Sequence, residues 1–140
     1  MTDEQKLAVD ELNNTDYSLI IVKNNNVQYR SKEESVSSIV SLMDNEPDLL
    51  KDSIVADKII GRAVAMVCDH ASVKYCYGSI ISEGAVDIFN RNNLPFNFNQ
   101  KVKAIRNRDN TDLCPIEKLT QNTNDSREGI KKIKEFLNKE

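Results

Sequence analysis

Apolar residues recur along this chain either at every second position, as in a strand, or at every third to fourth position, as in a helix. Each change from one period to the other marks a new element. Two β-rich runs, residues 17–22 and 26–30, flank an Asn-containing turn at 23–25. They predict a hairpin, because Asn tolerates the positive φ that such turns need. Residues 73–81 are rich in β-branched and aromatic side chains and predict a central strand. Alternating apolar and polar residues over 96–105 predict a half-buried strand whose lysines suit an edge.

Helical spacing fills the remaining segments. Thr2 with Gln5, and Ser31 with Glu34, are capping-box patterns that favour helix starts. Pro47 breaks the chain, and Ser82 caps a further helix. The helices expected cover residues 2–12, the segment around 36–43, 52–69, the segment from 82 to 91, and the chain after 125. The apolar stripe of the longest is Val55, Ile59, Ile60, Ala63, Val64 and Val67.

This order of elements predicts a single α/β domain over residues 1–140, with a mixed sheet covered by helices. The strand–helix–strand unit should be right-handed, which makes its two strands parallel. Ligands in such sheets bind beyond the carboxyl ends of the parallel strands. Those ends are residues 81–84 and the segment from 106 onward, so we expect a site there.

Composition narrows the class of protein. The chain has 140 residues, 39% hydrophobic and 29% charged, with a net charge of −3. This composition is typical of a globular domain and argues against a nucleic-acid binder, which needs a basic surface. No apolar run approaches the ~20 residues of a membrane span. The acidic N-terminus has no signal-peptide pattern, so we expect a cytoplasmic protein. Three cysteines without an export signal argue against a disulfide framework.

The densest chemistry lies in residues 107–117. Pro115 suits the first position of a helix, which makes Cys114 its N-cap, where a thiol tends toward thiolate. Glu117, one turn on, could act as proton acceptor or orienter for a nucleophilic Cys114. The alternative interpretation is structural: Glu117 is an ordinary capping-box residue and Cys114 a small packed side chain. No histidine is near in sequence, since the single one is His70.

The polar residues before this helix allow two interpretations. They could hold a polar ligand, with the Arg108 guanidinium suited to a phosphate or carboxylate, or they could form a solvated turn. The residues in question are Asn107, Arg108, Thr111 and Asp112.

Within the expected helix 52–69, Lys58 and Arg62 stand four residues apart and would repel each other. A bound anion would relieve that repulsion, and so would Asp57 or water. Gly61 in the same helix marks close packing or a close ligand approach. Cys68-Asp69-His70 lacks the converging spacing of a zinc site, so we expect no metal and no cofactor.

Two motif clusters together resemble a small prokaryotic family of unknown function with a cytidine-deaminase-like fold. The clusters are Asp57-Lys58-x-x-Gly61-Arg62-Ala63 and Asn107-Arg108-x-x-Thr111-Asp112-x-Cys114-Pro115-x-Glu117. The resemblance implies a three-layer α/β/α sandwich around a mixed sheet. It also implies that the two clusters meet at the position of the deaminase active site.

True deaminases bind zinc through His-x-Glu or Cys-x-Glu and Pro-Cys-x-x-Cys motifs, and this chain has neither pattern. We therefore expect a zinc-less protein that binds a small polar ligand of the nucleotide or nucleobase type. If it is an enzyme, Cys114 is the nucleophile and Glu117 its partner, while Asp57, Lys58, Arg62 and Arg108 orient the ligand. The alternative hypothesis is a non-catalytic interaction module or homodimer that pairs through a sheet edge or helix face.

Overall fold

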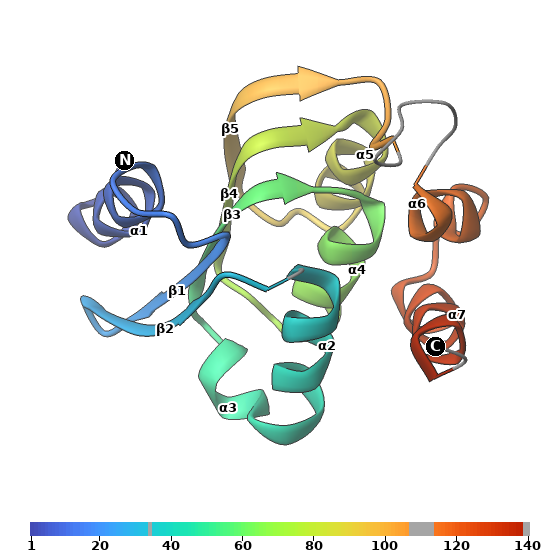
Figure 1. Ribbon diagram of the computed structural model, residues 1–140, viewed down its shortest axis with the longest axis horizontal. Helices are drawn as coiled ribbons and strands as arrows, with labels where there is room; N and C mark the ends of the chain where they lie inside the picture. Colours follow the sequence, from blue (N-terminus) through green and yellow to red (C-terminus); the bar gives the residue numbers. More distant parts are fainter. Residues whose placement is uncertain (34, 107–113, 139–140) are drawn as a thin grey trace.

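A five-stranded mixed sheet forms the centre of the molecule in the computed structural model, which describes residues 1–33, 35–106 and 114–138 (Figure 1). The strand order is β2-β1-β3-β4-β5. Strand β1 pairs antiparallel with β2 on one side and with β3 on the other, whereas β3, β4 and β5 run parallel. The strands are β1 (Leu19–Lys23), β2 (Asn26–Ser31), β3 (Ile54–Ile60), β4 (Tyr75–Ser82) and β5 (Phe96–Val102). The predicted mixed α/β architecture and the parallel pairing of β4 with β5 are confirmed.

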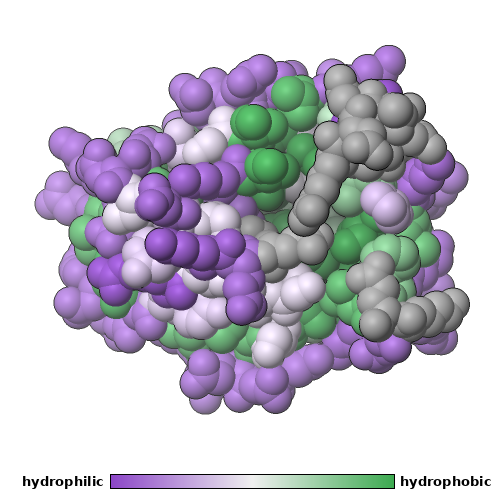
Figure 2. All heavy atoms as spheres, in the orientation of Figure 1, coloured by the Kyte–Doolittle hydropathy of each residue, from purple (hydrophilic) through white to green (hydrophobic). Residues whose placement is uncertain are grey.

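Helices flank the sheet on both sides (Figure 1). Helix α1 packs on β1 and β3 over a small core, and a larger core fills the space between the sheet and the other helices. The helices are α1 (Asp3–Asn13), α2 (Ser35–Asn45), α3 (Pro47–Leu50), α4 (Arg62–His70), α5 (Glu83–Arg91), α6 (Pro115–Thr120) and α7 (Ser126–Asn138). The face of the molecule in Figure 2 is largely polar, and apolar residues gather on it beside α6 and α7.

Several elements begin or turn at the residues that local sequence signals predicted. The hairpin turn places Asn24 and Asn25 at φ of 55° and 61°. The Ser82 hydroxyl accepts the Ala85 N–H at 3.0 Å and caps α5. Pro115 is the first residue of α6 and Cys114 its N-cap. The Ser31 prediction was wrong, because Ser31 ends β2 and α2 begins only at Ser35.

The predicted helix over 52–69 was also wrong. Its first half is strand β3, and its second half is the shorter helix α4. Strand β3 lies between β1 and β4 and is buried along most of its length, so its apolar residues form a nearly continuous run. Such a run also fits helical spacing, which periodicity alone does not resolve. Gly61 separates the two elements and is the N-cap of α4.

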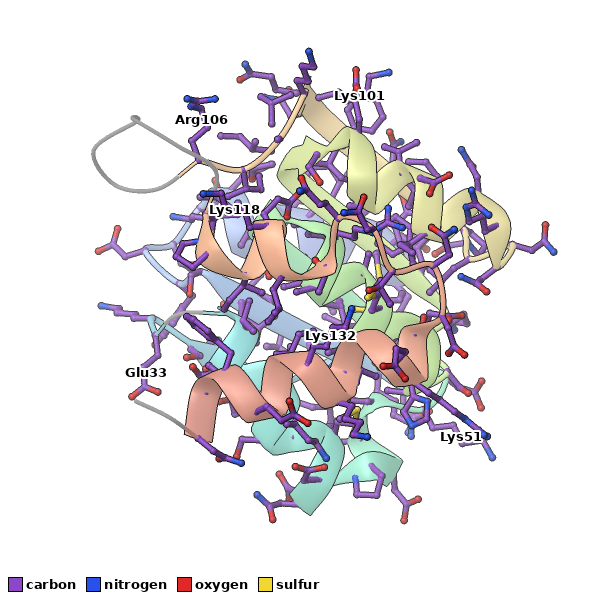
Figure 3. The ribbon with its side chains drawn as sticks, turned by 90° about the vertical axis from the view of Figure 1, so that its right-hand side faces the viewer. Glu33, Lys51, Lys101, Arg106, Lys118 and Lys132 are labelled. Atoms are coloured by element: carbon purple, nitrogen blue, oxygen red, sulfur yellow. The ribbon has the colours of Figure 1, made fainter. Side chains whose placement is uncertain are left out.

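The fold brings distant segments together at the carboxyl ends of the parallel strands. Helices α4 and α5 begin directly after β3 and β4, and α6 packs against α4. The Cys114 N–H donates to the Ile105 carbonyl at 2.9 Å, which joins the start of α6 to the chain that follows β5. Figure 3 shows α6, with Lys118, and α7, with Lys132, on the same side of the molecule. In the described part of the chain, the helices are too short or too polar to cross a bilayer.

Candidate functional site

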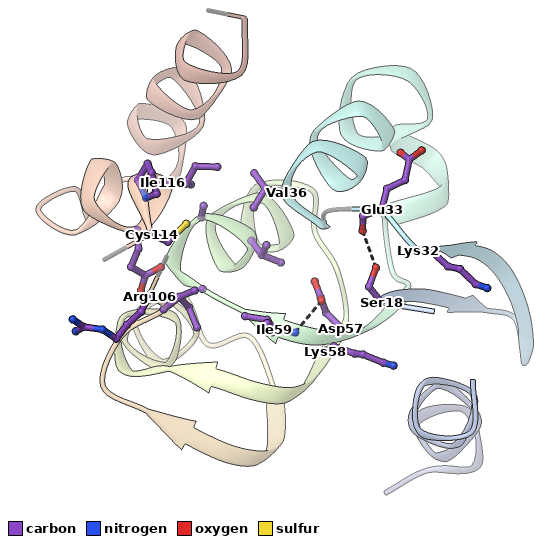
Figure 4. Close-up of a pocket in the computed structure, with 16 residues that line it drawn as sticks. Ser18, Lys32, Glu33, Val36, Asp57, Lys58, Ile59, Arg106, Cys114 and Ile116 are labelled. Carbon is purple, nitrogen blue, oxygen red and sulfur yellow. Dashed lines mark hydrogen bonds between the residues drawn. The ribbon is translucent and has the colours of Figure 1, made fainter. Parts of the chain in front are cut away.

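A cavity of about 570 Å³ lies beyond the carboxyl end of β3, between α2, α4 and α6 (Figure 4). Its apolar wall comes mainly from the three helices and the segment after β5. The lining residues are Ser18, Lys32, Glu33, Val36, Asp57, Lys58, Ile59, Gly61, Ala63, Val64, Ile105, Arg106, Cys114, Pro115, Ile116 and Glu117. A second hollow, of about 890 Å³, shares Ile59, Ile105 and Arg106 with it. The cavity has the size of a small-molecule site.

Asp57 supplies a buried carboxylate to this cavity. It lies on β3, opposite Gly78 of β4, and only 1% of the residue is exposed. Its Oδ1 accepts the Ile59 N–H at 3.1 Å, and the side chain projects into the space between β3 and α2 (Figure 4). A carboxylate this deeply buried is kept in place by hydrogen bonds from its surroundings, because burying an unpaired charge costs several kcal/mol.

Cys114 lies across the cavity at the start of α6. The residue is partly exposed, and its side chain makes no capping hydrogen bond. The other two cysteines, Cys68 and Cys76, are fully buried in the core. The protein therefore presents one accessible thiol within the described residues, and that thiol borders the cavity.

Glu117 does not form the capping box that its position in α6 suggests. Its Oε2 accepts the backbone N–H of Arg62, at 3.1 Å, and so caps the first turn of α4. The residue is only 6% exposed. A Cβ at Gly61 would lie 2.6 Å from this oxygen, so the carboxylate approaches α4 closely because residue 61 is glycine. A negative charge at this place is favoured by the α4 dipole. The close packing expected at Gly61 is thus confirmed.

Lys58 and Arg62 do not stand on one helix face, so the repulsion expected from helical spacing has no basis in this fold. Lys58 lies on β3, and its Nζ donates to the Thr15 carbonyl at 3.3 Å, away from the cavity (Figure 4). Arg62 is not among the lining residues. It is 5% exposed, and its guanidinium contacts α5 and the end of α6 instead. The structure thus brings Asp57, Cys114 and Glu117 to the cavity. Lys58 lines it too, but its ammonium is turned away, and Arg62 lies behind it.

Four predicted ligand-binding residues, Asn107, Arg108, Thr111 and Asp112, lie outside the described residues. Other lining residues come from the two ends of the hairpin and were not predicted from the sequence. The Ser18 hydroxyl donates to the Glu33 carbonyl at 2.7 Å, which joins these two segments at one edge of the cavity (Figure 4). Neither residue belongs to a recognisable motif, and only the predicted hairpin indicated that their segments are neighbours.

Ionisable side chains at the cavity divide into an inner and an outer set. The carboxylates of Asp57 and Glu117 are buried, whereas the charged ends of Lys32, Lys58 and Arg106 extend outward in Figure 4. In residues 1–33, 35–106 and 114–138, no group of three or more His, Cys, Asp and Glu side chains is arranged to hold a metal ion.

Comparisons with known proteins agree with this fold and add no activity. The family described as TM1506: Domain of unknown function (DUF1893) matches residues 7–137. The crystal structure of a DUF1893 family protein (TM1506) from Thermotoga maritima is similar, with a TM-score of 0.88 and 23% identity. The match covers 96% of this chain and 90% of that one. No curated protein sequence matches the chain.

Proposed function

Because the chain belongs to the DUF1893 family of unknown function, we propose a function from the cavity itself: it binds a small polar ligand of the nucleotide or nucleobase type. We also infer a cytidine-deaminase-like variant of the α/β fold. The five-stranded mixed sheet with helices on both sides is compatible with that assignment. The zinc motifs of deaminases are missing from the sequence, so the proposal includes neither zinc nor deamination.

One observation carries the proposal: a carboxylate that is 1% exposed projects into an apolar-walled cavity of about 570 Å³. A buried carboxylate accepts hydrogen bonds, so it selects ligands that present N–H donors. The amino and amide edge of a nucleobase has such donors on a flat apolar ring. The walls formed by Val36, Val64 and Ile116 suit the faces of that ring.

A Cys114-dependent reaction is the catalytic form of the same proposal. Cys114 would be the nucleophile and Glu117 its acidic partner, because both line the cavity with Asp57. Glu117 already accepts one backbone N–H, which fixes its carboxylate near the start of α4. Asp57 would orient the ligand from β3, whereas the Lys58 ammonium donates to the Thr15 carbonyl away from the cavity and is given no ligand contact in this proposal. Binding roles for Asn107, Arg108, Thr111 and Asp112 remain predictions from the sequence, and the location proposed for the protein is the cytoplasm.

The single accessible thiol provides the test. Burial raises the pKa of the Cys76 thiol, and its hydrogen bond to Cys68 and the charges of Cys68 and Asp57 act in the same direction. Iodoacetamide should therefore modify the folded protein at Cys114 alone, which mass spectrometry can verify. Nucleobases, nucleosides and their monophosphates, each at millimolar concentration, would then be screened for slower modification of Cys114.

We expect at least one nucleobase-containing compound to protect Cys114 and to raise the melting temperature. Asp57→Asn should abolish this protection, because the amide replaces half of the acceptor with a donor. Asp10→Asn is the matched control, since Asp10 is exposed on α1 at the other face of the sheet. The ligand proposal fails if no compound protects the thiol. The catalytic form fails if Cys114 reacts no faster at neutral pH than free cysteine.

The alternative is a non-catalytic module that pairs with itself or another protein. Ile59, which lines both hollows, is 48% exposed and would be covered if a partner docked over them. Sedimentation velocity distinguishes the hypotheses. A concentration-dependent dimer that dissociates in Ile59→Ser, combined with no protection of Cys114 by any compound, would favour the interaction module.

A further inference from the structure

We propose that Arg62 is a positioning residue for the candidate site: it holds α6 in the orientation that places Cys114 and Glu117 at the cavity. This inference rests on the proposed function, because it assigns Arg62 a role in that same site. Arg62 does not line the cavity and lies in the first turn of α4, with 5% of its surface exposed. It acts on the site only through its neighbours.

Two guanidinium nitrogens of Arg62, Nε and Nη2, reach the far end of α6 and the turn that follows it. Nε donates to the Thr120 carbonyl at 2.8 Å and to the Thr123 carbonyl at 3.1 Å. Nη2 donates to the same Thr123 carbonyl at 2.7 Å and to Asn124 Oδ1 at 2.7 Å. The backbone N–H of Arg62 holds the beginning of α6, through Glu117 at 3.1 Å. One residue of α4 thus binds α6 at both ends.

The remaining nitrogen connects this assembly to α5. Nη1 donates to the Gly84 carbonyl at 3.1 Å and to Asp87 Oδ2 at 3.3 Å. Burial alone would raise the pKa of Asp87, but hydrogen bonds from Arg91 and Arg62, and their positive charges, outweigh that effect and lower it. Asp87 therefore stays ionised beside Arg62 at neutral pH. Helix α6 is fixed to both α4 and α5 through one guanidinium.

The chemistry of arginine explains why this residue type holds the position. Its guanidinium is planar, stays charged, and directs five donors in a fixed fork. A buried charge with all donors matched holds its partners in a narrow geometry, and losing it leaves several buried carbonyls unpaired. Helix α6 has only six residues, too few to be stable alone, so its orientation depends on these contacts.

The three cysteines provide a readout that a purely structural role would not change. If Arg62 positions α6, Arg62→Ala should free that helix locally and expose Cys114, while Cys68 and Cys76 stay protected in the core. Iodoacetamide should then modify Cys114 ~10-fold faster than in the wild type, as local opening predicts. Arg62→Lys keeps the charge but lacks the fork, so an intermediate rate is expected.

Leu12→Ala is the matched control. Leu12 belongs to α1 and is fully buried against the other face of the sheet, so its truncation lowers global stability without touching α6. Even if Leu12→Ala lowers the melting temperature as much as the Arg62 variants do, iodoacetamide should modify its Cys114 at the wild-type rate. If Arg62→Ala does not fold, Arg62→Lys compared with Leu12→Ala decides the question.

Two results would overturn the inference. One is that iodoacetamide modifies Cys114 in both Arg62 variants at the wild-type rate. The other is faster modification of all three cysteines together, which indicates global unfolding. This rate needs no ligand, so it is separate from the proposed function. The proposed function fails if no nucleobase, nucleoside or monophosphate, cytidine and adenosine included, slows the modification of wild-type Cys114. That outcome does not depend on the result for the Arg62 variants.

Discussion

Two neighbouring helices of this protein begin in the same structural context and satisfy their first N–H groups in different ways. Helices α4 and α5 each follow a parallel strand of the sheet. Helix α5 is capped by Ser82, the residue directly before it, whose hydroxyl accepts the Ala85 N–H. Helix α4 begins at Arg62, after an N-cap glycine, Gly61, that has no side chain. The Arg62 N–H donates instead to Glu117, 55 residues further along the chain.

The difference shows how a helix start becomes part of a site. A local cap such as Ser82 satisfies an N–H of the first turn from within its own segment, so this hydrogen bond needs no distant partner. The uncapped start of α4 attracts a carboxylate from α6, and Gly61 leaves the room that this approach needs. As a result, the beginning of α4 and the beginning of α6 line one cavity.

Removing the long-range cap should have the largest effect. Glu117→Ala leaves the buried Arg62 N–H without its acceptor and removes the favourable charge at the α4 dipole. We expect a loss of ~2–3 kcal/mol in the free energy of unfolding. Urea denaturation followed by circular dichroism measures it. Glu117→Gln retains an acceptor for the Arg62 N–H, so its free energy of unfolding should fall by less. A loss below ~0.5 kcal/mol for Glu117→Ala, as at an ordinary surface position, would contradict the assignment.

A serine placed before α4 should have opposite effects in two backgrounds. In the wild type, the Cβ of Gly61→Ser would lie 2.6 Å from Glu117 Oε2 and push the carboxylate away, at a cost of ~1–2 kcal/mol. In Glu117→Ala, the same serine meets no carboxylate and can cap α4 as Ser82 caps α5, which should stabilise by ~0.5–1 kcal/mol. A double-mutant cycle measures this coupling. Equal effects in both backgrounds would show that Glu117 and residue 61 act independently.

Loss of the local cap should have the smallest effect and no effect on the site. Ser82→Ala should lower the free energy of unfolding by ~1 kcal/mol, the usual cost of losing an N-cap hydroxyl. Cys114 should keep its wild-type rate of reaction with iodoacetamide, because Ser82 does not line the cavity. Ser82→Thr retains the hydroxyl and is the control. A changed rate at Cys114 in Ser82→Ala would show that the two helix starts are coupled.

The sequence by itself determined those elements whose hydrogen bonds close within a few residues. The Asn24–Asn25 turn, the Ser82 cap and Pro115 at the start of α6 each depend on local backbone preferences, and the structure confirms all three. The placement of Cys114 at that helix start was predictable for the same reason. These signals act over one turn of chain, so no tertiary contact is needed to read them.

Only the tertiary structure decided the rest of the candidate site. Strand β3 was mistaken for helix because a strand buried on both faces has no polar alternation, and this error moved Asp57 and Lys58 to the wrong kind of element. Glu117 has the spacing of a local capping residue, yet its partner is Arg62. Buried polar groups must find partners wherever the fold provides them, and partners 55 residues apart leave no pattern in the sequence.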